Sequence, residues 1–354
     1  MSNLRRLREA MTAAGIPALI VSEIGNVQWL TGFTGSAGIV LLTEREAMFV
    51  TDSRYTLQAG EEVREMPVAS FASPVLLADF LRDQIQMLGV RSIGFESSHV
   101  TYATFEDWAK RLAPIELMGV PDLIGPLRMI KSPQEIEAIR HACGLADACF
   151  THIQRLVQPG ISEFDIGLEI EFYFRRNGAE IAFAPVVVSG HRSARPHGRA
   201  SEKKLDTGDF LTLDFGARID GYNSDITRTL VVAEASERHR EIYDTVLRAQ
   251  LASLEAMKPG VPAREVDAVA RQEMGDLAQY FGHGLGHGLG RLVHDGGRLN
   301  ATSSDILAEG QVWTVEPGIY IEDFGGVRIE DDVVVTESGI EILTHSPKEM
   351  MVLP

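Results

Sequence analysis

The stretch that decides the fold of the C-terminal half is LTLDFGARIDGYNSDITRTLVV, residues 211–232. Two apolar strand runs flank Asp220-Gly221, a residue pair that strongly favours a two-residue hairpin turn. With that turn, Asp225 faces Gly216 and becomes a diagonal cross-strand neighbour of Asp214, within about 7–8 Å. Two carboxylates in an apolar setting repel each other unless a cation compensates them. The hairpin alone also fits two carboxylates that face solvent.

A second informative segment is FGHGLGHGLGRLVHD, residues 281–295, in which glycine alternates with histidine or leucine. So much glycine disfavours a helix. In an extended chain His283 and His287 project from one face, and the glycines let another backbone approach closely. His294 follows seven positions after His287. One histidine is more often structural than a ligand, whereas three in so short a glycine-rich run favour a functional site.

Two glutamates lie on predicted strands further along the chain. Glu316 lies in TVEPGIY, and Glu330 lies in GVRIEDDVVVT, two positions after Arg328. A glutamate on a strand usually faces solvent. Their spacing in the sequence does not predict that they meet.

The 354 residues exceed the length of a typical domain, so two domains are expected. Helix and strand patterns alternate over residues 1–125, which predicts an α/β domain. Ser132-Pro133 then begins a helix, with serine as the N-cap and proline in the first position. Residues 126–354 combine helices with hairpin strands and predict an α+β domain.

Composition excludes several classes of protein. The net charge of −17 argues against a nucleic-acid or anionic-membrane surface. No stretch approaches the roughly 18 apolar residues of a membrane span, and the N-terminus does not resemble a secretory signal. We therefore expect a cytoplasmic protein. Cys143 and Cys149 fit two buried thiols better than a disulfide or a metal clip.

Taken in order, the segments LDFGARIDGYNSDITRT, HGLGHGLGRLVH, VEPGIY and GVRIEDD resemble the signature of the pita-bread metallopeptidases, in the branch that contains prolidase and aminopeptidase P. NVQWLTGFTGS and TDSRY resemble the creatinase-type N-terminal domain of the same branch. The resemblance implies a pita-bread α+β catalytic domain, built from duplicated αβ halves and preceded by a smaller α/β domain. It also implies a homodimer.

The resemblance further implies a ligand set for two divalent metal ions. Asp225 would bind one ion, Asp214 and Glu330 would bridge both, and Glu316 and His287 would bind the second. Four carboxylates carry four negative charges, which two divalent ions balance, while a neutral imidazole adds none. An oxygen-rich set with one imidazole suits manganese, although cobalt or zinc can also enter.

The implied activity is hydrolysis of the Xaa-Pro peptide bond of a small proline-containing peptide by a hydroxide that the two ions share. Glu316 would relay a proton to the leaving proline nitrogen, and His294 would stabilise the oxyanion. His197 and His283 match histidines that contact substrate. Arg328 is a further catalytic candidate.

The chain departs from the family pattern near the substrate end of the site. The family often has leucine in place of Arg195, an apolar residue or a Leu-Glu pair in place of Arg291-Leu292, and HEAP in place of HDGG. Extra cations there can bind the free carboxylate of a dipeptide, which favours an Xaa-Pro dipeptidase, or prolidase. Arg195 and Arg291 could equally well serve only to balance the charge of nearby acidic groups. Arg45 and Arg54 of the first domain are further candidates.

Three alternatives remain open. An aminopeptidase P removes the first residue before proline from longer peptides. A creatinase-like enzyme shares both domains without the metal ligands, and a non-catalytic binding protein could use the same fold. The last two would be expected to have lost ligands, whereas all five are present here.

Overall fold

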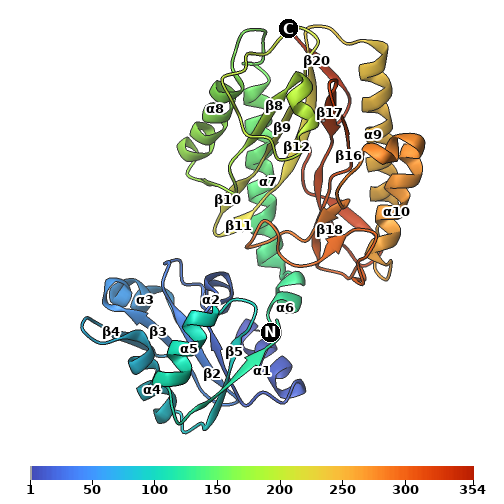
Figure 1. The fold of residues 1–354 in the computed structure, drawn as a ribbon. Helices are drawn as coiled ribbons and strands as arrows, with labels where there is room; N and C mark the ends of the chain where they lie inside the picture. Colours follow the sequence, from blue (N-terminus) through green and yellow to red (C-terminus); the bar gives the residue numbers. More distant parts are fainter. Residues whose placement is uncertain (1) are drawn as a thin grey trace. The chain divides into compact units, whose positions relative to one another are not determined.

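The computed structural model describes residues 2–354, which form two compact units divided between Arg128 and Met129. The boundary expected after residue 125 stays a prediction, and that part of the chain forms the short helix α6 (Gly125–Met129). Figure 1 shows the helices and strands of each unit. The helices formed by residues 2–354 do not include one with the length and hydropathy of a membrane span.

The smaller unit is built on one six-stranded sheet with the order β4-β3-β2-β1-β5-β6. Its strands are β1 (Ala18–Val21), β2 (Ile39–Thr43), β3 (Ala47–Asp52), β4 (Val68–Phe71), β5 (Ser92–Glu96) and β6 (Glu116–Val120). Neighbouring strands are parallel except for the pairs β1–β2 and β2–β3. Its helices are α1 (Asn3–Ala13), α2 (Ile24–Thr31), α3 (Thr56–Glu62), α4 (Leu77–Met87) and α5 (Tyr102–Arg111).

Both faces of this sheet are buried. Leu19 and Val21 of β1 pack in one cluster with Leu7 of α1. Ile20 points to the other face and packs in a second cluster with Leu81 of α4. A strand covered on both faces has no need of polar residues, which explains the continuous apolar run in β1. The expected α/β layer structure is therefore present.

The larger unit contains several small sheets. One is the four-stranded sheet β20 (Met351–Leu353), β12 (Ile226–Val232), β9 (Phe210–Phe215) and β8 (Val186–Ser189). A second contains β15 (Val312–Val315), β18 (Asp331–Val335) and β19 (Ile340–Ile342). A third contains β11 (Tyr222–Asn223), β10 (Ala217–Ile219) and β7 (Glu180–Ile181). Two further sheets have two strands each: one pairs β16 (Gly318–Ile321) with β17 (Gly325–Arg328), and the other pairs β13 (Gly286–His287) with β14 (Arg298–Leu299).

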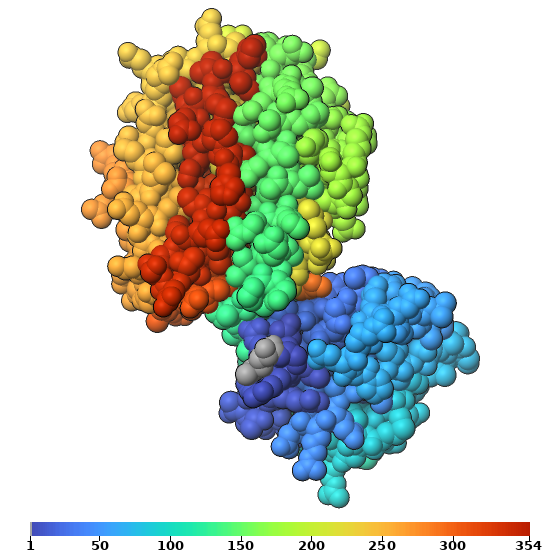
Figure 2. All heavy atoms as spheres, turned by 180° about the vertical axis from the view of Figure 1, so that it is seen from behind, coloured from blue at the N-terminus to red at the C-terminus, as the bar shows by residue number. Residues whose placement is uncertain are grey.

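Two pairs of helices cover these strands from opposite sides (Figure 1). The helices are α7 (Pro133–Ile153), α8 (Glu163–Arg176), α9 (Glu237–Ala256) and α10 (Ala263–Met274). One apolar cluster joins α7 and α8 to β8, β9 and β12, and another joins α9 and α10 to β15, β16, β17 and β18. Figure 2 shows the C-terminal segment, in red, between the α7 segment and the α9 segment. These are the two αβ halves that the resemblance implies.

The hairpin has the predicted register. Ile219 pairs with Tyr222, and the antiparallel ladder continues through Asp214 and Thr227. Asp220 and Gly221 have φ of 51° and 79°. Positive φ at both central residues is what a type I′ turn requires. The predicted diagonal relation of Asp225 to Asp214 is confirmed.

Both glutamates lie in short breaks between strands, whereas the sequence predicts a strand interrupted by Pro317 around Glu316 and a strand through Glu330. Glu316 follows β15 and precedes β16, and Glu330 separates β17 from β18. Pro317 explains the first break, because proline has no N–H for the ladder. A side chain at such a break need not alternate with the strand, so each glutamate can point inward. Cys143 and Cys149 are buried and free, as predicted.

Candidate metal centre

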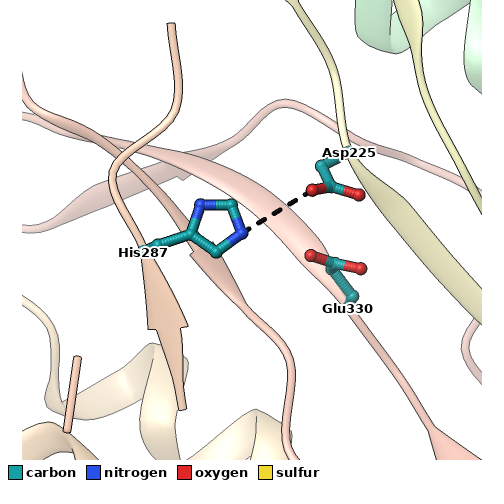
Figure 3. Close-up of side chains that lie close together, drawn as sticks. All are labelled: Asp225, His287 and Glu330. Atoms are coloured by element: carbon teal, nitrogen blue, oxygen red, sulfur yellow. Dashed lines mark ion pairs between the residues drawn. The ribbon is translucent and has the colours of Figure 1, made fainter. Parts of the chain in front are cut away.

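Three buried side chains of the larger unit converge (Figure 3): Asp225, His287 and Glu330. One ligand atom from each lies within 4.8 Å of the others. Nε2 of His287 is 3.7 Å from Oδ2 of Asp225. Two carboxylates and an imidazole at this separation form a set that can hold a metal ion.

Two of these residues, Glu330 and His287, are oriented by local hydrogen bonds. Thr227 donates its hydroxyl to Oε2 of Glu330 at 2.6 Å. The backbone N–H of His287 donates to Oγ1 of Thr314 at 3.0 Å. Since Thr227 lies on β12 and Thr314 on β15, strands from both αβ halves hold the cluster.

Glu316 and Asp214 extend the cluster on two sides. Oε1 of Glu316 lies 3.5 Å from Nε2 of His287. Oδ2 of Asp214 accepts a hydrogen bond from the guanidinium of Arg328. Oδ1 of Asp214 is buried and has no hydrogen-bond partner within residues 2–354. An unpartnered buried carboxylate oxygen beside other carboxylates is a position that a cation would satisfy.

The carboxylates of the cluster resist ionisation in the metal-free protein. Burial raises the pKa of Asp225 well above its usual range, and the charges of Glu330 and Asp214 raise it further. The pKa of Glu330 is also raised well above its usual range, by burial and by the neighbouring Glu316 and Asp214 carboxylates. Burial raises the pKa of Glu316 to about 7, although Arg328 opposes this shift. A divalent cation removes the repulsion, so the donor set fits divalent metal ions.

The histidines of the site favour the neutral form. Burial lowers the pKa of His287 to about 4, with a further contribution from His294. A neutral imidazole is the form that binds metals. Burial also lowers the pKa of His283 to about 4, and Arg328 adds to this effect. The imidazole rings of His287 and His294 lie 4.2 Å apart, edge to face.

A cavity of about 180 Å³ opens onto the cluster. It is lined by the three histidines expected to contact substrate, together with members of the cluster: His197, His283, His294, His287, Asp214, Glu316 and Arg328. A second hollow of about 420 Å³ shares His287, His294 and Arg298 with it. The candidate catalytic residues therefore line one shared space.

Of the arginines proposed from the sequence, Arg195 and Arg291 belong to the same unit as the cluster. Arg291 is 9% exposed, and its guanidinium lies over the ring of Tyr222, 5.0 Å from the centroid. Arg195 is exposed. In the part of the chain that the structure describes, neither is among the residues that line the two spaces. Arg54, in the smaller unit, pairs with Asp52 at 2.8 Å.

Two residues of the site escaped sequence reasoning. Arg298 is exposed and lines both spaces. Its position four residues after His294 was an available signal. The hydroxyl of Tyr320 lies 2.9 Å from Nε2 of His283 and accepts a hydrogen bond from Arg328, also at 2.9 Å. Tyr320 is the last residue of the VEPGIY motif, so the motif itself could have indicated it.

Known proteins resemble this chain along its whole length. The model of metallopeptidase family M24 matches residues 137–337, and that of the creatinase/prolidase N-terminal domain matches residues 3–130. An Xaa-Pro dipeptidase of Pyrococcus horikoshii is 36% identical over 353 residues, 98% of each chain. A solved Xaa-Pro dipeptidase structure from Bacillus anthracis has a TM-score of 0.96 at 41% identity and covers 99% of both chains.

An X-Pro aminopeptidase structure from Thermotoga maritima has a TM-score of 0.90 at 35% identity, covering 98% of this chain and 100% of that one. These likenesses confirm the fold class predicted from the sequence.

Proposed function

This chain belongs to metallopeptidase family M24, and on that premise we propose that it hydrolyses the Xaa-Pro bond of dipeptides, as an Xaa-Pro dipeptidase or prolidase. The observation that carries the proposal is the convergence of Asp225, His287 and Glu330 beside a cavity lined by three further histidines. The dipeptidases among the relatives match over nearly their full length, which supports the same activity here.

We propose that five residues hold two divalent ions, manganese by preference. Asp225 would hold one ion, Glu316 and His287 would hold the second, and Asp214 and Glu330 would help to hold both. The unpartnered Oδ1 of Asp214 and the raised pKa values of the carboxylates support this set. When bound, such a pair of ions activates a water molecule and polarises the scissile carbonyl.

The side chains around the ions supply proton transfer and orientation. In the proposal, Glu316 accepts a proton from the attacking water and passes it to the prolyl nitrogen, which must be protonated to leave. His294 faces the cavity and donates a hydrogen bond to the carbonyl oxygen as negative charge develops there. His197 and His283 orient the substrate. Tyr320 links His283 to Arg328, which keeps the wall of the cavity in one arrangement.

Arg298 is the cation best placed to recognise a free carboxylate. It lines both spaces together with His287 and His294. A dipeptide presents its carboxylate one residue beyond the scissile bond, where a longer peptide presents a neutral amide. A charge-assisted contact to that carboxylate favours dipeptides. We propose Arg298 ahead of Arg195, Arg291 and Arg54 for this role.

A second candidate function is Xaa-Pro aminopeptidase activity on longer peptides. The hollow of about 420 Å³ continues from the cavity and offers space for further residues. The likeness to the Thermotoga maritima X-Pro aminopeptidase supports this alternative.

The two functions are separated by a panel of Xaa-Pro peptides of two to five residues, assayed with added manganese. An Xaa-Pro dipeptidase cleaves the dipeptide best, whereas an aminopeptidase prefers Xaa-Pro-Yaa and longer peptides. If no Xaa-Pro peptide is cleaved by protein with verified metal content, the proposed function is wrong.

We further propose a cytoplasmic homodimer. The resemblance to the family supports these two points. Light scattering coupled to size-exclusion chromatography measures the oligomeric state directly, and a monomeric mass of 38.8 kDa would contradict the dimer.

A further inference from the structure

Asn223 connects two segments of the site by hydrogen bonds. One is the strand that precedes Asp225, and the other is the loop that precedes His294. Asn223 is the last residue of β11. Its backbone N–H donates to the carbonyl of Gly290 at 2.9 Å. Its side-chain amide donates to the same carbonyl at 2.9 Å and to the carbonyl of Arg291 at 3.0 Å. Asn223 is 2% exposed, so water cannot replace these bonds.

The chain between Asn223 and Asp225 is held tightly. Ser224 donates its N–H to the carbonyl of Ala217 at 2.9 Å, and its hydroxyl accepts from the N–H of Ala217 at 3.0 Å. The N–H of Asp225 donates to Oδ2 of Asp332 at 2.8 Å. A Cβ on Gly216 would lie 1.8 Å from the Ser224 carbonyl oxygen. Asn223 and Asp225 therefore lie at the two ends of a three-residue segment whose backbone is fixed.

The loop on the other side is closed by its own hydrogen bonds. The N–H of Arg291 donates to Oδ2 of Asp295 at 3.0 Å, and the N–H of Asp295 donates to the carbonyl of Gly288 at 2.7 Å. His294 precedes Asp295, and Gly288 follows His287. The two carbonyls that Asn223 binds thus belong to the turn that ends at His294.

We propose that Asn223 is a positioning residue that sets the spacing between the metal ligand Asp225 and His294. Asparagine suits this task because its planar amide carries two N–H donors, which reach two consecutive carbonyls. An aspartate of the same shape has no donor and would place negative charge against both carbonyl oxygens. Catalysis depends on such spacing, since a misplacement of about 1 Å can lower a rate about 100-fold.

The first test measures the loop itself and needs no activity. Hydrogen exchange of the metal-free protein is followed by mass spectrometry in wild type, Asn223→Ala and Asn223→Asp. Val246→Ala is the matched control, because it truncates a fully buried side chain of α9 and lowers global stability without touching either segment. We expect the amides of residues 288–296 to exchange at least about 10-fold faster in both Asn223 variants, with no selective change there in Val246→Ala. Unchanged exchange in the Asn223 variants, or the same change in the control, would overturn the proposal.

The second test is a double-mutant cycle, and it rests on the proposed function. With saturating manganese, Asn223→Ala should lower kcat on an Xaa-Pro dipeptide about 10- to 100-fold and change KM by less than about 3-fold. In a His294→Ala background the same change should lower kcat by less than about 3-fold, because the residue through which Asn223 acts is already missing. Equal effects in both backgrounds would show that Asn223 does not act through His294. If wild type fails to cleave the dipeptide, the proposed function fails, while the exchange experiment still decides whether Asn223 holds the loop.

Discussion

Arg328 donates a hydrogen bond to one carboxylate oxygen of Asp214, and the other oxygen of that carboxylate has no partner within residues 2–354. One guanidinium thus offsets part of the charge of a cluster that also contains Asp225, Glu316 and Glu330. The remaining negative charge is relieved either by protons or by cations. This competition determines how the protein responds to metal removal.

Chelation should abolish activity and lower the melting temperature together, and manganese should restore both. In the metal-free protein the pKa values of Asp225 and Glu330 are raised by burial, and that of Glu316 is about 7. At these three carboxyl groups the folded metal-free state binds more protons than the unfolded chain, in which they titrate near about 4. Their contribution to stability should fall as pH rises from about 4 to about 7, whereas that of His283 and His287, whose pKa values are lowered to about 4, should rise. Manganese replaces the carboxyl protons, so the stabilisation by manganese should grow over the same range. Thermal melts with and without chelator at several pH values measure this difference, and full activity in verified metal-free protein would contradict the two-metal proposal.

His294→Ala should lower turnover while metal content stays near wild type. His287→Ala should lose metal as well. Loss of one oxyanion donor typically lowers turnover on the order of 10²–10³, or about 3–4 kcal/mol. Steady-state kinetics and elemental analysis of both purified variants distinguish the two roles. If His294→Ala emptied the site and His287→Ala did not, the assignments would have to be exchanged.

Arg298→Ala should reduce the preference for dipeptides over tripeptides. A charge-assisted contact of about 1.5–3 kcal/mol corresponds to a change of roughly 10- to 150-fold in KM for the dipeptide. The tripeptide, whose carboxylate lies one residue further on, should be affected much less. Parallel assays on Xaa-Pro and Xaa-Pro-Yaa measure the ratio.

Arg195→Ala, Arg291→Ala and Arg54→Ala are the comparison variants for this experiment. Arg195 and Arg54 are exposed, so their loss should leave stability nearly unchanged. Arg291 is buried against Tyr222, and its loss should lower stability more than it alters the ratio. An unchanged ratio in all four variants would reject selection by a cation, and aminopeptidase activity would become the better description.

Asp331→Asn should destabilise the fold by about 3–5 kcal/mol at neutral pH, because it leaves the buried charge of Arg228 without its partner. Arg228 and Lys348 lie 2.8 and 2.7 Å from the Asp331 carboxylate. Burial opposes ionisation of Asp331, but these two cations outweigh it and lower its pKa. The stabilisation is therefore present above the unfolded pKa of about 3.9 and is lost as pH falls through the lower folded value.

Urea unfolding of chelator-treated wild type and Asp331→Asn between about pH 3 and pH 7 measures this effect without a contribution from metal release. The difference between the two proteins should shrink at the acid end. A constant difference across that range would show that the charge of Asp331 is not responsible.

The sequence by itself determined the features that depend on neighbours along the chain. Asp220-Gly221 specifies its turn because only residues that tolerate positive φ fit it, and the turn sets the register that brings Asp225 diagonal to Asp214. The alternating helix and strand patterns of residues 1–125 predicted the α/β domain for a similarly local reason. The motifs then indicated the family, and through it the candidate ligands.

Only the tertiary structure decided which distant residues meet. Glu330 reaches the cluster because it lies at a break between strands. Its carboxylate accepts a hydrogen bond from the hydroxyl of Thr227, which lies 103 positions earlier in the chain. Arg298 lines the cavity and Arg291 turns away from it toward Tyr222, although both follow the same glycine-rich run. The role of Asn223 depends on carbonyls more than sixty residues away. Such contacts arise from the packing of whole strands and loops, which the periodicity of the sequence does not predict.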